Sequence, residues 1–293
     1  MHNYSFIIPH KNTPELLQRC LASIPERKDI QIIVVDDNSD GGKKPTINRK
    51  DVELILLDAE HAKGAGRARN VGLEHAEGKW VLFPDADDYY ADDFIEILDT
   101  YIEKDFDILY FNYDFIEGNT GKTISPHKLQ RVLGDFDGTK VAHDFVKYRN
   151  NVPWTKMVLN DYIKNYHFYF EEVLNGNDIF FALSIGYHTD RILVEKRPVY
   201  IHAWNENSIS TSKKTVASAL CRLEHVIKKN YFLEQVGHKK WKISVYKRFC
   251  RHTKYLGIPF LTASIRKSIH LYINRKDWWE NILTFQSDSK ASI

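Results

Sequence analysis

Nearly continuous apolar runs alternate with amphipathic stretches through the first third of the chain. The runs are short and rich in β-branched residues, as is typical of strands buried on both faces of a sheet. The stretches between them place apolar residues at helical spacing. This alternation predicts an α/β fold with a doubly wound, mainly parallel sheet. The expected strands begin at Ser5, Ile30, Val52 and Lys79, and the expected helices cover residues 13–24, 64–78 and 91–104.

The pattern loosens after residue 118 and becomes periodic again near residue 177. NDIFFALSIGY, at residues 177–187, predicts a helix, and RILVEKRPVYIHAW, at residues 191–204, predicts one or two strands. From about Val216 the pattern is helical and basic. The last seven residues, 287–293, predict a disordered tail.

Acidic side chains follow three of the four strands predicted in the first third. They are Asp36 and Asp37, then Asp58, then the group Asp85, Asp87 and Asp88. Ligands bind at the carboxyl ends of parallel strands, so these acids are expected to surround a site. Their negative field disfavours a bare polyanion but suits a divalent cation, Mg²⁺ or Mn²⁺, that in turn binds a diphosphate. The alternative for the last group is capping of the next helix, whose start already carries Asp92 and Asp93.

Composition narrows the class of protein. With 43% hydrophobic residues among 293, the chain can bury a sizeable core. Its three cysteines, Cys20, Cys221 and Cys250, are far apart, which argues against a disulfide framework or a zinc site. The N-terminus lacks the features of a signal peptide, and no apolar run approaches the ~20 residues of a membrane span. We therefore expect a cytoplasmic protein.

The net charge of +2 conceals a strong asymmetry. Residues 213–276 carry 16 Lys or Arg and only two acidic residues, so the remainder is acidic. Aromatic side chains are interspersed with these cations, as in helices that bind an anionic membrane surface, here the inner face of the cell membrane. The alternatives are a helical cap on the acidic body and a helix-mediated homodimer. Nucleic acid is not expected, because no recognition motif is present.

Several motifs follow one another in order between residues 4 and 211. IIPHKNTPELLQRCLASI precedes IIVVDDNSDGG and then GAGRARNVGLEHAEGKWVLFPDADD, which contains a DxD motif. In this order they resemble family 2 glycosyltransferases of the GT-A fold, of the type that makes bacterial surface polysaccharides. The resemblance implies a catalytic domain at residues 1–212, divided into a nucleotide-sugar half (1–105) and an acceptor half (106–212). A basic helical extension would occupy residues 213–286.

The resemblance implies roles for five residues on the donor side. Asp87 would bind a Mn²⁺ or Mg²⁺ ion that bridges the two phosphates of a nucleoside-diphosphate sugar. Asp85 would lie toward the ribose and the donor sugar. Asp37 would accept a hydrogen bond from the base, Pro9 would line the same pocket, and Arg69 would lie near the nucleotide. A UDP-sugar is the favoured donor.

A second block resembles the acceptor side of the family, where a Pro-Trp-x-Lys segment precedes a Gly-Glu-Asp triplet. Here the triplet is GND, at residues 176–178. By resemblance Asp178 is the general base of an inverting transfer, and its alternative role is to cap the next helix. Lys156 is expected at the surface. Candidate contacts to donor or acceptor are Trp154, Asn177 and His202, with a buried aromatic as the alternative for the Trp and a structural role for the His.

These features predict a metal-dependent inverting glycosyltransferase that moves a sugar to a hydroxyl of a glycan or lipid-linked acceptor. One alternative is a nucleotide-sugar-binding scaffold protein of the same fold without turnover. Another is a sugar-phosphate nucleotidylyltransferase, which would need a Gly-rich basic loop after the first strand, where this chain has PHKN. Within PHKN, Lys11 stands where the resembled family usually has an aromatic residue that stacks on the base.

Overall fold

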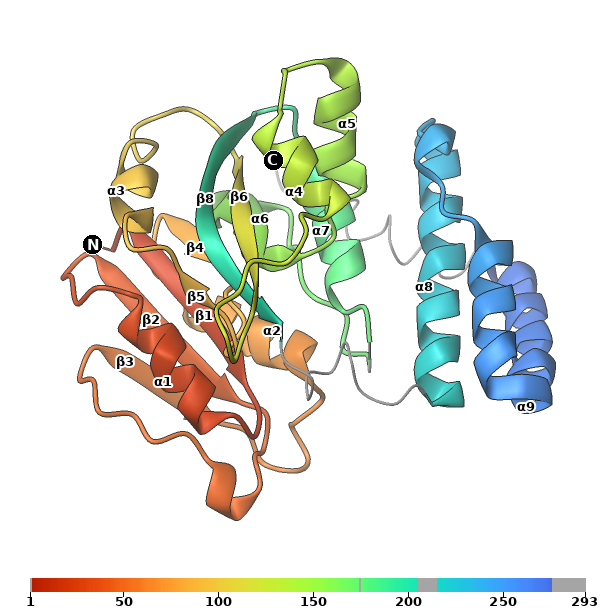
Figure 1. Ribbon diagram of the computed structural model, residues 1–293, viewed down its shortest axis with the longest axis horizontal. Helices are drawn as coiled ribbons and strands as arrows, with labels where there is room; N and C mark the ends of the chain where they lie inside the picture. Colours follow the sequence, from red (N-terminus) through yellow and green to blue (C-terminus); the bar gives the residue numbers. More distant parts are fainter. Residues whose placement is uncertain (1, 174, 205–214, 276–293) are drawn as a thin grey trace.

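Eight strands form one sheet in the order β3-β2-β1-β4-β7-β6-β8-β5 (Figure 1). The computed structural model describes residues 2–173, 175–204 and 215–275. The strands are β1 (Tyr4–His10), β2 (Ile30–Asp36), β3 (Val52–Leu56), β4 (Trp80–Leu82), β5 (Tyr89–Tyr90), β6 (Ile108–Glu117), β7 (Lys156–Leu159) and β8 (Ile192–Trp204). The helices are α1 (Pro14–Ala22), α2 (Ala65–His75), α3 (Phe94–Asp99), α4 (Lys128–Gly134), α5 (Lys140–Tyr148), α6 (Asn160–Asn165), α7 (Asp178–Tyr187), α8 (Val216–Gln235) and α9 (Val245–Ile273).

The first four strands in this order form a parallel sheet. β1 pairs with β2 along its whole length, from Tyr4↔Ile30 to His10↔Asp36, and β3 and β4 extend the sheet on either side. β7 and β5 run antiparallel to their neighbours, so the sheet is mixed but mainly parallel, as predicted. The carboxyl ends of the parallel strands therefore meet at one edge, where a ligand site is expected.

β4 is shorter than the apolar run that predicts it. Its pairing ends at Leu82, although Phe83 and Pro84 are also buried. Pro84 has no N–H group and therefore cannot continue the ladder. The chain leaves the sheet here, which allows Asp85 and the residues after it to form a loop beyond the strand end.

Sequence patterns did not reveal the elements between residues 118 and 170. This region contains α4, α5, β7 and α6. β7 has only four residues and lies inside the sheet between β4 and β6, so its burial depends on strands distant in the chain. The run at residues 191–204 forms one strand, β8, and its pairing with β6 shifts register between Phe111 and Tyr113.

The C-terminal helices pack on the sheet domain. α8 lies against α7, and α9 lies along α8 (Figure 1). A small apolar core joins α8 to α5 and α7, and full burial of each such side chain stabilises the fold by about 2 kcal/mol. α9 bends at Gly257, whose φ of 65° suits glycine, just before Pro259. The apolar core that joins α8 to α5 and α7 consists of Tyr148, Phe180, Leu183, Phe232 and Leu233.

The predicted helical extension is confirmed. The predicted boundary after residue 212 and the predicted tail at residues 287–293 lie outside the described residues.

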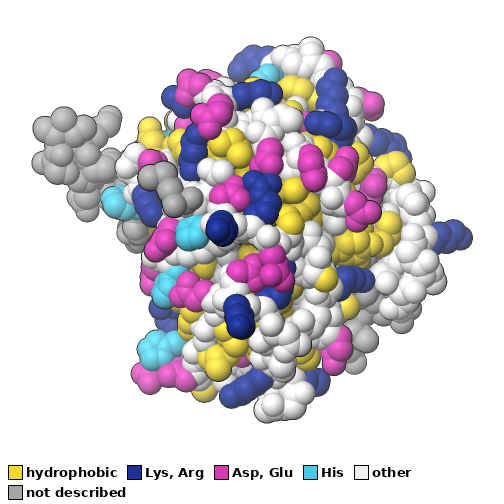
Figure 2. Space-filling model, turned by 90° about the vertical axis from the view of Figure 1, so that its left-hand side faces the viewer, with side chains coloured by type: hydrophobic (Ala, Val, Ile, Leu, Met, Phe, Trp, Pro, Cys, Tyr) yellow, Lys and Arg dark blue, Asp and Glu magenta, His cyan; other side chains and the backbone are white. Residues whose placement is uncertain are grey.

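Acidic and basic side chains are intermingled on the face of the molecule opposite α8 and α9 (Figure 2). The excess of basic residues belongs to the C-terminal region, where residues 213–276 hold 16 Lys or Arg. In the part of the chain that the structure describes, no helix is both long and apolar enough to cross a membrane.

Candidate active site

Three carboxylates gather in the loop after β4. Ligand oxygens of Asp85, Asp87 and Asp88 all lie within 4.8 Å of one another. Burial, followed by the charges of Asp88 and Asp85, raises the pKa of Asp87 to about 7. Carboxylates this close repel one another unless a proton or a cation lies between them. Carboxylate oxygens are also the ligands that Mg²⁺ and Mn²⁺ prefer, so the residues fit the predicted cation.

Asp88 differs from the other two acids because both of its oxygens already have partners, whereas Asp85 has one oxygen bound to Arg69. It is completely buried and accepts hydrogen bonds from the Tyr200 hydroxyl (3.0 Å) and the Ala203 amide (2.8 Å). The Nδ1 atom of His202 lies 3.0 Å from the Oδ2 atom of Asp88. Asp87, assisted by Asp85, is therefore the residue that would hold a cation, and Asp88 anchors the loop to β8.

His202 and Tyr200 belong to this anchor. The Tyr200 hydroxyl also accepts a hydrogen bond from the Asp85 amide at 2.9 Å, which fixes the loop backbone. Burial lowers the pKa of His202, but the hydrogen bond and charge of Asp88 outweigh it, and the net pKa is raised. A protonated His202 forms an ion pair with Asp88, so the structure gives this predicted contact residue a supporting position.

Trp154 packs behind the same anchor. Only 7% of its surface is exposed, and its ring stacks on those of Tyr200 and His202, with centroids 5.1 Å away in both cases. It thus occupies the position of a buried aromatic, the alternative considered from the sequence. Through these stacked rings Trp154 supports the residues that hold Asp88.

Arg69 joins the acidic loop to the start of α7. Its guanidinium donates to Asp85 (2.5 Å) and to the side-chain oxygen of Asn177 (3.1 Å), and it lies over the Phe170 ring. The next residue, Asn70, both donates to and accepts from the backbone of Phe170, at 2.9 and 2.8 Å. The two polar residues of the ARN motif therefore hold the segment that leads to Asp178.

The glycine-containing start of α2 allows this close approach. A Cβ atom at Gly66 would lie 2.2 Å from the carbonyl oxygen of Glu171 and 3.0 Å from the Cβ atom of Asn177. Any larger residue would push the segment before α7 away from Arg69. The predicted site residues Arg69, Asp85 and Asn177 are in this way brought together from three separate parts of the chain.

Asp178 is the first residue of α7. The preceding Asn177 occupies the N-cap position without a side-chain capping bond, because its oxygen faces Arg69. Burial raises the pKa of Asp178, and the charge of Arg69 opposes that shift. The Asp178 side chain is half-buried, and a carboxylate with a raised pKa is a stronger base, which suits proton removal.

Lys156 is buried, so its predicted place at the surface is wrong. Its ammonium donates to the carbonyl oxygens of Asn150 (3.1 Å) and Val152 (2.5 Å). Burial lowers the pKa of Lys156 to about 7, against the opposing charge of Asp178. Lys229 of α8 is likewise buried, and its pKa is lowered to about 7 by burial and by Arg149. The neighbourhood of Asp178 therefore contains two amines that are easily neutralised.

α8 holds the segment before Asp178 through side chains that sequence reasoning missed. Cys221 donates to the carbonyl of Asn175 (3.2 Å), whose side chain donates to Ser218 (3.2 Å). His225 lies 3.0 Å from Glu171. Burial lowers the pKa of His225, but contacts with Cys221 and Glu171 outweigh it and raise the pKa to about 10. The spacing of Ser218, Cys221 and His225 places them on one face of a helix, which the sequence alone can show. The sequence does not show that this face contacts the segment before Asp178.

Asp37 and Pro9 lie at the ends of the first two strands. The Asp37 carboxylate accepts from the Gly64 amide (2.9 Å) and from the Lys11 ammonium (3.1 Å). Pro9 is buried within β1, opposite Val35. Lys11, which replaces an aromatic residue of the resembled family, thus acts as a counter-ion of Asp37.

Asp36 and Asp58 have local roles apart from the acidic cluster. Asp36 is buried and bonds to His10 (2.7 Å) and to the Ser39 hydroxyl (2.6 Å). Since the Thr13 amide donates to the other nitrogen of His10, the Nδ1 atom carries the proton toward Asp36. Asp58 bonds to His61 in its own turn.

Similarity to known proteins identifies the family. The model for glycosyl transferase family 2 matches residues 5–174. The chain belongs to this family. It is 26% identical over 90% of its length to the glycosyltransferase YibD of Escherichia coli K12, covering 79% of that protein. It is 28% identical over 43% of its length to WfgD of Escherichia coli, described as a UDP-Glc:alpha-D-GlcNAc-diphosphoundecaprenol beta-1,3-glucosyltransferase, and the match spans about half (52%) of WfgD.

Solved structures confirm the GT-A fold. Residues 1–349 of TarS from Staphylococcus aureus, in complex with UDP-GlcNAc, superpose with a TM-score of 0.65 at 18% identity, over 91% of this chain and 79% of that chain. The mannosyltransferase PcManGT of Pyrobaculum calidifontis, in complex with GDP-Man and Mn²⁺, gives a TM-score of 0.56 at 15% identity, over 99% of this chain and 86% of that chain. The predicted family and fold are confirmed, and the nucleotidylyltransferase alternative is removed.

Proposed function

We propose that the protein is a metal-dependent inverting glycosyltransferase. It would move a sugar from a nucleoside-diphosphate sugar, with a UDP-sugar favoured, to a hydroxyl of a glycan or lipid-linked acceptor. The observation that carries this proposal is the bridge by Arg69, which contacts Asp85 of the acidic loop and the residue beside Asp178. A candidate cation site and a candidate base are therefore neighbours, which supports their working together in one reaction.

The donor would lie across the carboxyl ends of β1, β2 and β4. Asp87, with Asp85, would hold Mg²⁺ or Mn²⁺, and the bound ion would neutralise charge on the leaving diphosphate. Asp37 and Pro9 would flank the nucleotide base. Lys11 would then leave Asp37 and contact the nucleotide instead. The names of WfgD and TarS, which mention UDP-Glc and N-acetylglucosaminyl transfer, support a UDP-sugar as the donor.

Asp178 would accept the proton of the acceptor hydroxyl. As the acceptor oxygen bonds to the anomeric carbon, the bond from that carbon to the diphosphate oxygen breaks, and the proton remains on Asp178 until solvent removes it. Attack opposite the leaving group inverts the anomeric configuration. Arg69 would hold Asp85 and Asn177 in place, with Trp154 and His202 supporting the acidic loop from behind.

The acceptor side is proposed from the relatives. WfgD is named for an acceptor carried on diphosphoundecaprenol, which supports a lipid-linked acceptor at the inner face of the cell membrane. The basic helices α8 and α9 would face that anionic surface. A homodimer through these helices is the competing arrangement.

Donor turnover tests the proposal. The purified protein is incubated with Mn²⁺ or Mg²⁺, a panel of nucleotide-sugars and the lipid-linked acceptor in the name of WfgD, alpha-D-GlcNAc-diphosphoundecaprenol. The released nucleoside diphosphate is then measured. We expect release from one donor, abolished by chelator and by Asp87→Asn. Absence of both turnover and calorimetric nucleotide binding would favour the scaffold alternative instead.

A further inference from the structure

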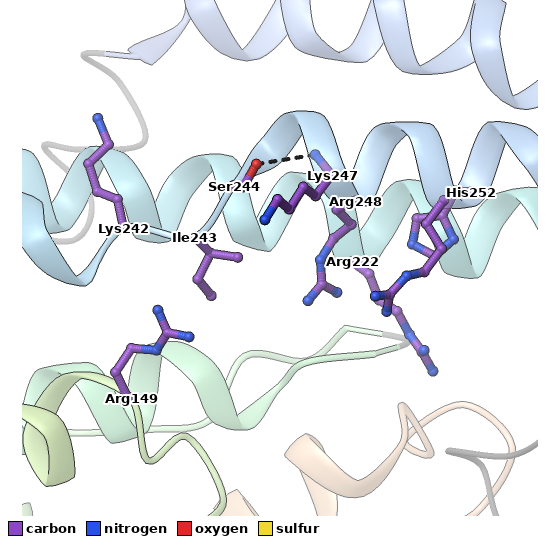
Figure 3. Close-up of a pocket in the computed structure, with 9 residues that line it drawn as sticks. Arg149, Arg222, Lys242, Ile243, Ser244, Lys247, Arg248 and His252 are labelled. Atoms are coloured by element: carbon purple, nitrogen blue, oxygen red, sulfur yellow. Dashed lines mark hydrogen bonds between the residues drawn. The ribbon is translucent and has the colours of Figure 1, made fainter. Parts of the chain in front are cut away.

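A pocket lined by basic side chains lies between the end of α5, helix α8 and the start of α9 (Figure 3). Its volume is about 380 Å³, within the range of small-molecule sites. Arg149 points into it from one wall and Ile243 from the opposite wall (Figure 3). Among the described residues that line it, none is acidic. Its cations are Arg149, Arg222, Lys242, Lys247, Arg248 and Arg251.

Most of these cations have no carboxylate partner in the described part of the chain. The two acids of residues 213–276 leave most of them unpaired. Glu224 pairs with Lys228 and Lys267, which do not line the pocket, and Glu234 pairs with Lys239 and with the pocket residue Lys242. Lys242 is thus the one pocket cation with a carboxylate within 4.0 Å among the described residues. The other five have no carboxylate within 4.0 Å among the described residues, although Arg149 donates to the Trp241 carbonyl at 3.1 Å.

This concentration of positive charge is unfavourable without an anion. Burial, and then the charges of Arg222 and Arg251, lower the pKa of Arg248. The N-terminus of α9 adds to the positive potential, because Ser244 at its N-cap lines the pocket and accepts a hydrogen bond from the Lys247 amide at 3.2 Å. A bound anion would relieve the repulsion between the guanidinium groups.

We propose that this pocket binds the phosphate groups of a diphosphate-type anion, at a site separate from the donor diphosphate at Asp87. Guanidinium groups match phosphate oxygens with paired hydrogen bonds, and four of the six cations are arginines. Nucleic acid fits less well, because no Phe, Tyr or Trp lines the described pocket to stack on bases. The phosphates belong either to a lipid headgroup or to a soluble anion.

Lys229 connects this pocket to the active site. Arg149, in the pocket wall, lowers the pKa of Lys229, and Asp178 opposes that effect. Arg149 and the proposed base therefore act on the same buried amine.

Titration calorimetry of the full chain with inorganic diphosphate tests the proposal. EDTA is present and donor is omitted, so the site at Asp87 does not contribute. We expect the double variant Arg222→Gln with Arg248→Gln to bind diphosphate at least about tenfold more weakly, because each removes charge-assisted hydrogen bonds. The matched control, Lys254→Gln with Arg266→Gln, removes two exposed cations of α9 outside the pocket and should bind within about twofold of wild type.

Vesicle binding distinguishes the sources of the phosphate. Vesicles of phosphatidylcholine, alone or mixed with phosphatidylglycerol, are sedimented with each protein. A greater loss of binding in the pocket variant than in the control identifies a lipid headgroup, and equal binding with selective loss of diphosphate affinity identifies a soluble anion. If the first variant unfolds, Lys247→Gln with Arg251→Gln, both exposed, takes its place.

Three results would overturn the proposal. They are undetectable diphosphate binding by wild type, equal losses in pocket and control variants, and wild-type affinity in a folded pocket variant. Donor turnover is measured separately on every variant. A protein that turns over donor but does not bind diphosphate in EDTA refutes the pocket alone, and the reverse result refutes the transferase alone.

Discussion

The proposed donor and acceptor sides of the candidate active site are built in different ways. On the donor side, Asp85, Asp87 and Asp88 are neighbours in the sequence, and one strand end presents them together. On the acceptor side, Asp178 sits on a segment held by Arg69 of α2 and by Ser218, Cys221 and His225 of α8. The donor side is thus a local motif, whereas the acceptor side is assembled from distant segments.

This difference indicates where each side is vulnerable. The acidic loop is anchored by Asp88, whose buried partners all come from β8. The segment before Asp178 depends instead on α8, which lies beyond the residues matched by the family model. Damage to α8 should therefore affect acceptor chemistry before it affects the donor site.

The largest effect is expected from Asp178→Asn. It removes the proposed base, and kcat should fall by about 10²–10⁴-fold while the KM for donor stays unchanged. Steady-state kinetics with a saturating acceptor checks this. Asp161→Asn is the matched control, because Asp161 also lies in the first turn of a helix but is exposed. An equal loss of kcat in the control would show that Asp178 acts only as a charge at the start of its helix and not as the base.

Arg69→Lys should break the bridge between the two sides. A lysine cannot reach Asp85 and Asn177 together with planar geometry, so kcat/KM should fall by about 10²-fold. Arg67→Lys on the same helix is the control, because the ion pairs of Arg67 among the described residues are with Glu74 and Glu172, at 3.8 and 3.6 Å. Donor affinity measured by calorimetry should weaken only in the Arg69 variant. If both variants behave alike, the bridge is unimportant.

His225→Gln should affect the acceptor side alone. Loss of the ion pair with Glu171 loosens the segment before Asp178, and kcat should fall about tenfold with donor affinity retained. His270→Gln, an exposed histidine on α9, is the control. A variant that loses donor affinity to the same extent would contradict the separation of the two sides.

The contacts of His225 with Cys221 and Glu171 also predict a pH dependence of stability. The pKa of His225 is raised in the folded protein to about 10, so its stabilisation is fully present below the unfolded pKa of about 6.5 and is lost as the pH rises through about 10. The free energy of unfolding of wild type should therefore exceed that of His225→Gln at pH 6 by about 1–3 kcal/mol, and this difference should shrink toward pH 10. Urea unfolding at several pH values measures it, and a constant difference would contradict the ion pair.

The smallest effect is expected from Trp154→Phe. A phenylalanine keeps an aromatic face toward Tyr200 and His202, so unfolding should become easier by only about 1 kcal/mol and kcat should change less than about threefold. Thermal unfolding and the donor-turnover assay check both values. A large fall in donor or acceptor affinity would show that Trp154 contacts a sugar directly.

Local sequence patterns are enough to predict the parallel half of the sheet and the acids at its edge. Continuous β-branched runs predict buried strands, and the chain direction then places Asp37, Asp85 and Asp87 at the same edge. The motifs GAGRARN and PDADD lie within one strand-helix-strand unit. Their resemblance to the family can therefore be recognised without knowing how the rest of the chain folds. Local patterns suffice where the interacting residues are near in sequence or in adjacent parallel strands.

Which charged residues are buried, and what they contact, depends instead on the packing of segments that are distant in the chain. Asp88 resembles its neighbours in sequence, but it is buried because β8, more than a hundred residues later, covers it. Lys156 belongs to a short strand whose neighbours come from elsewhere, and so no local pattern predicts its burial. The contact between Glu171 and His225 spans 54 positions. Burial and pKa depend on everything that packs around a group, and that environment is set by the whole fold.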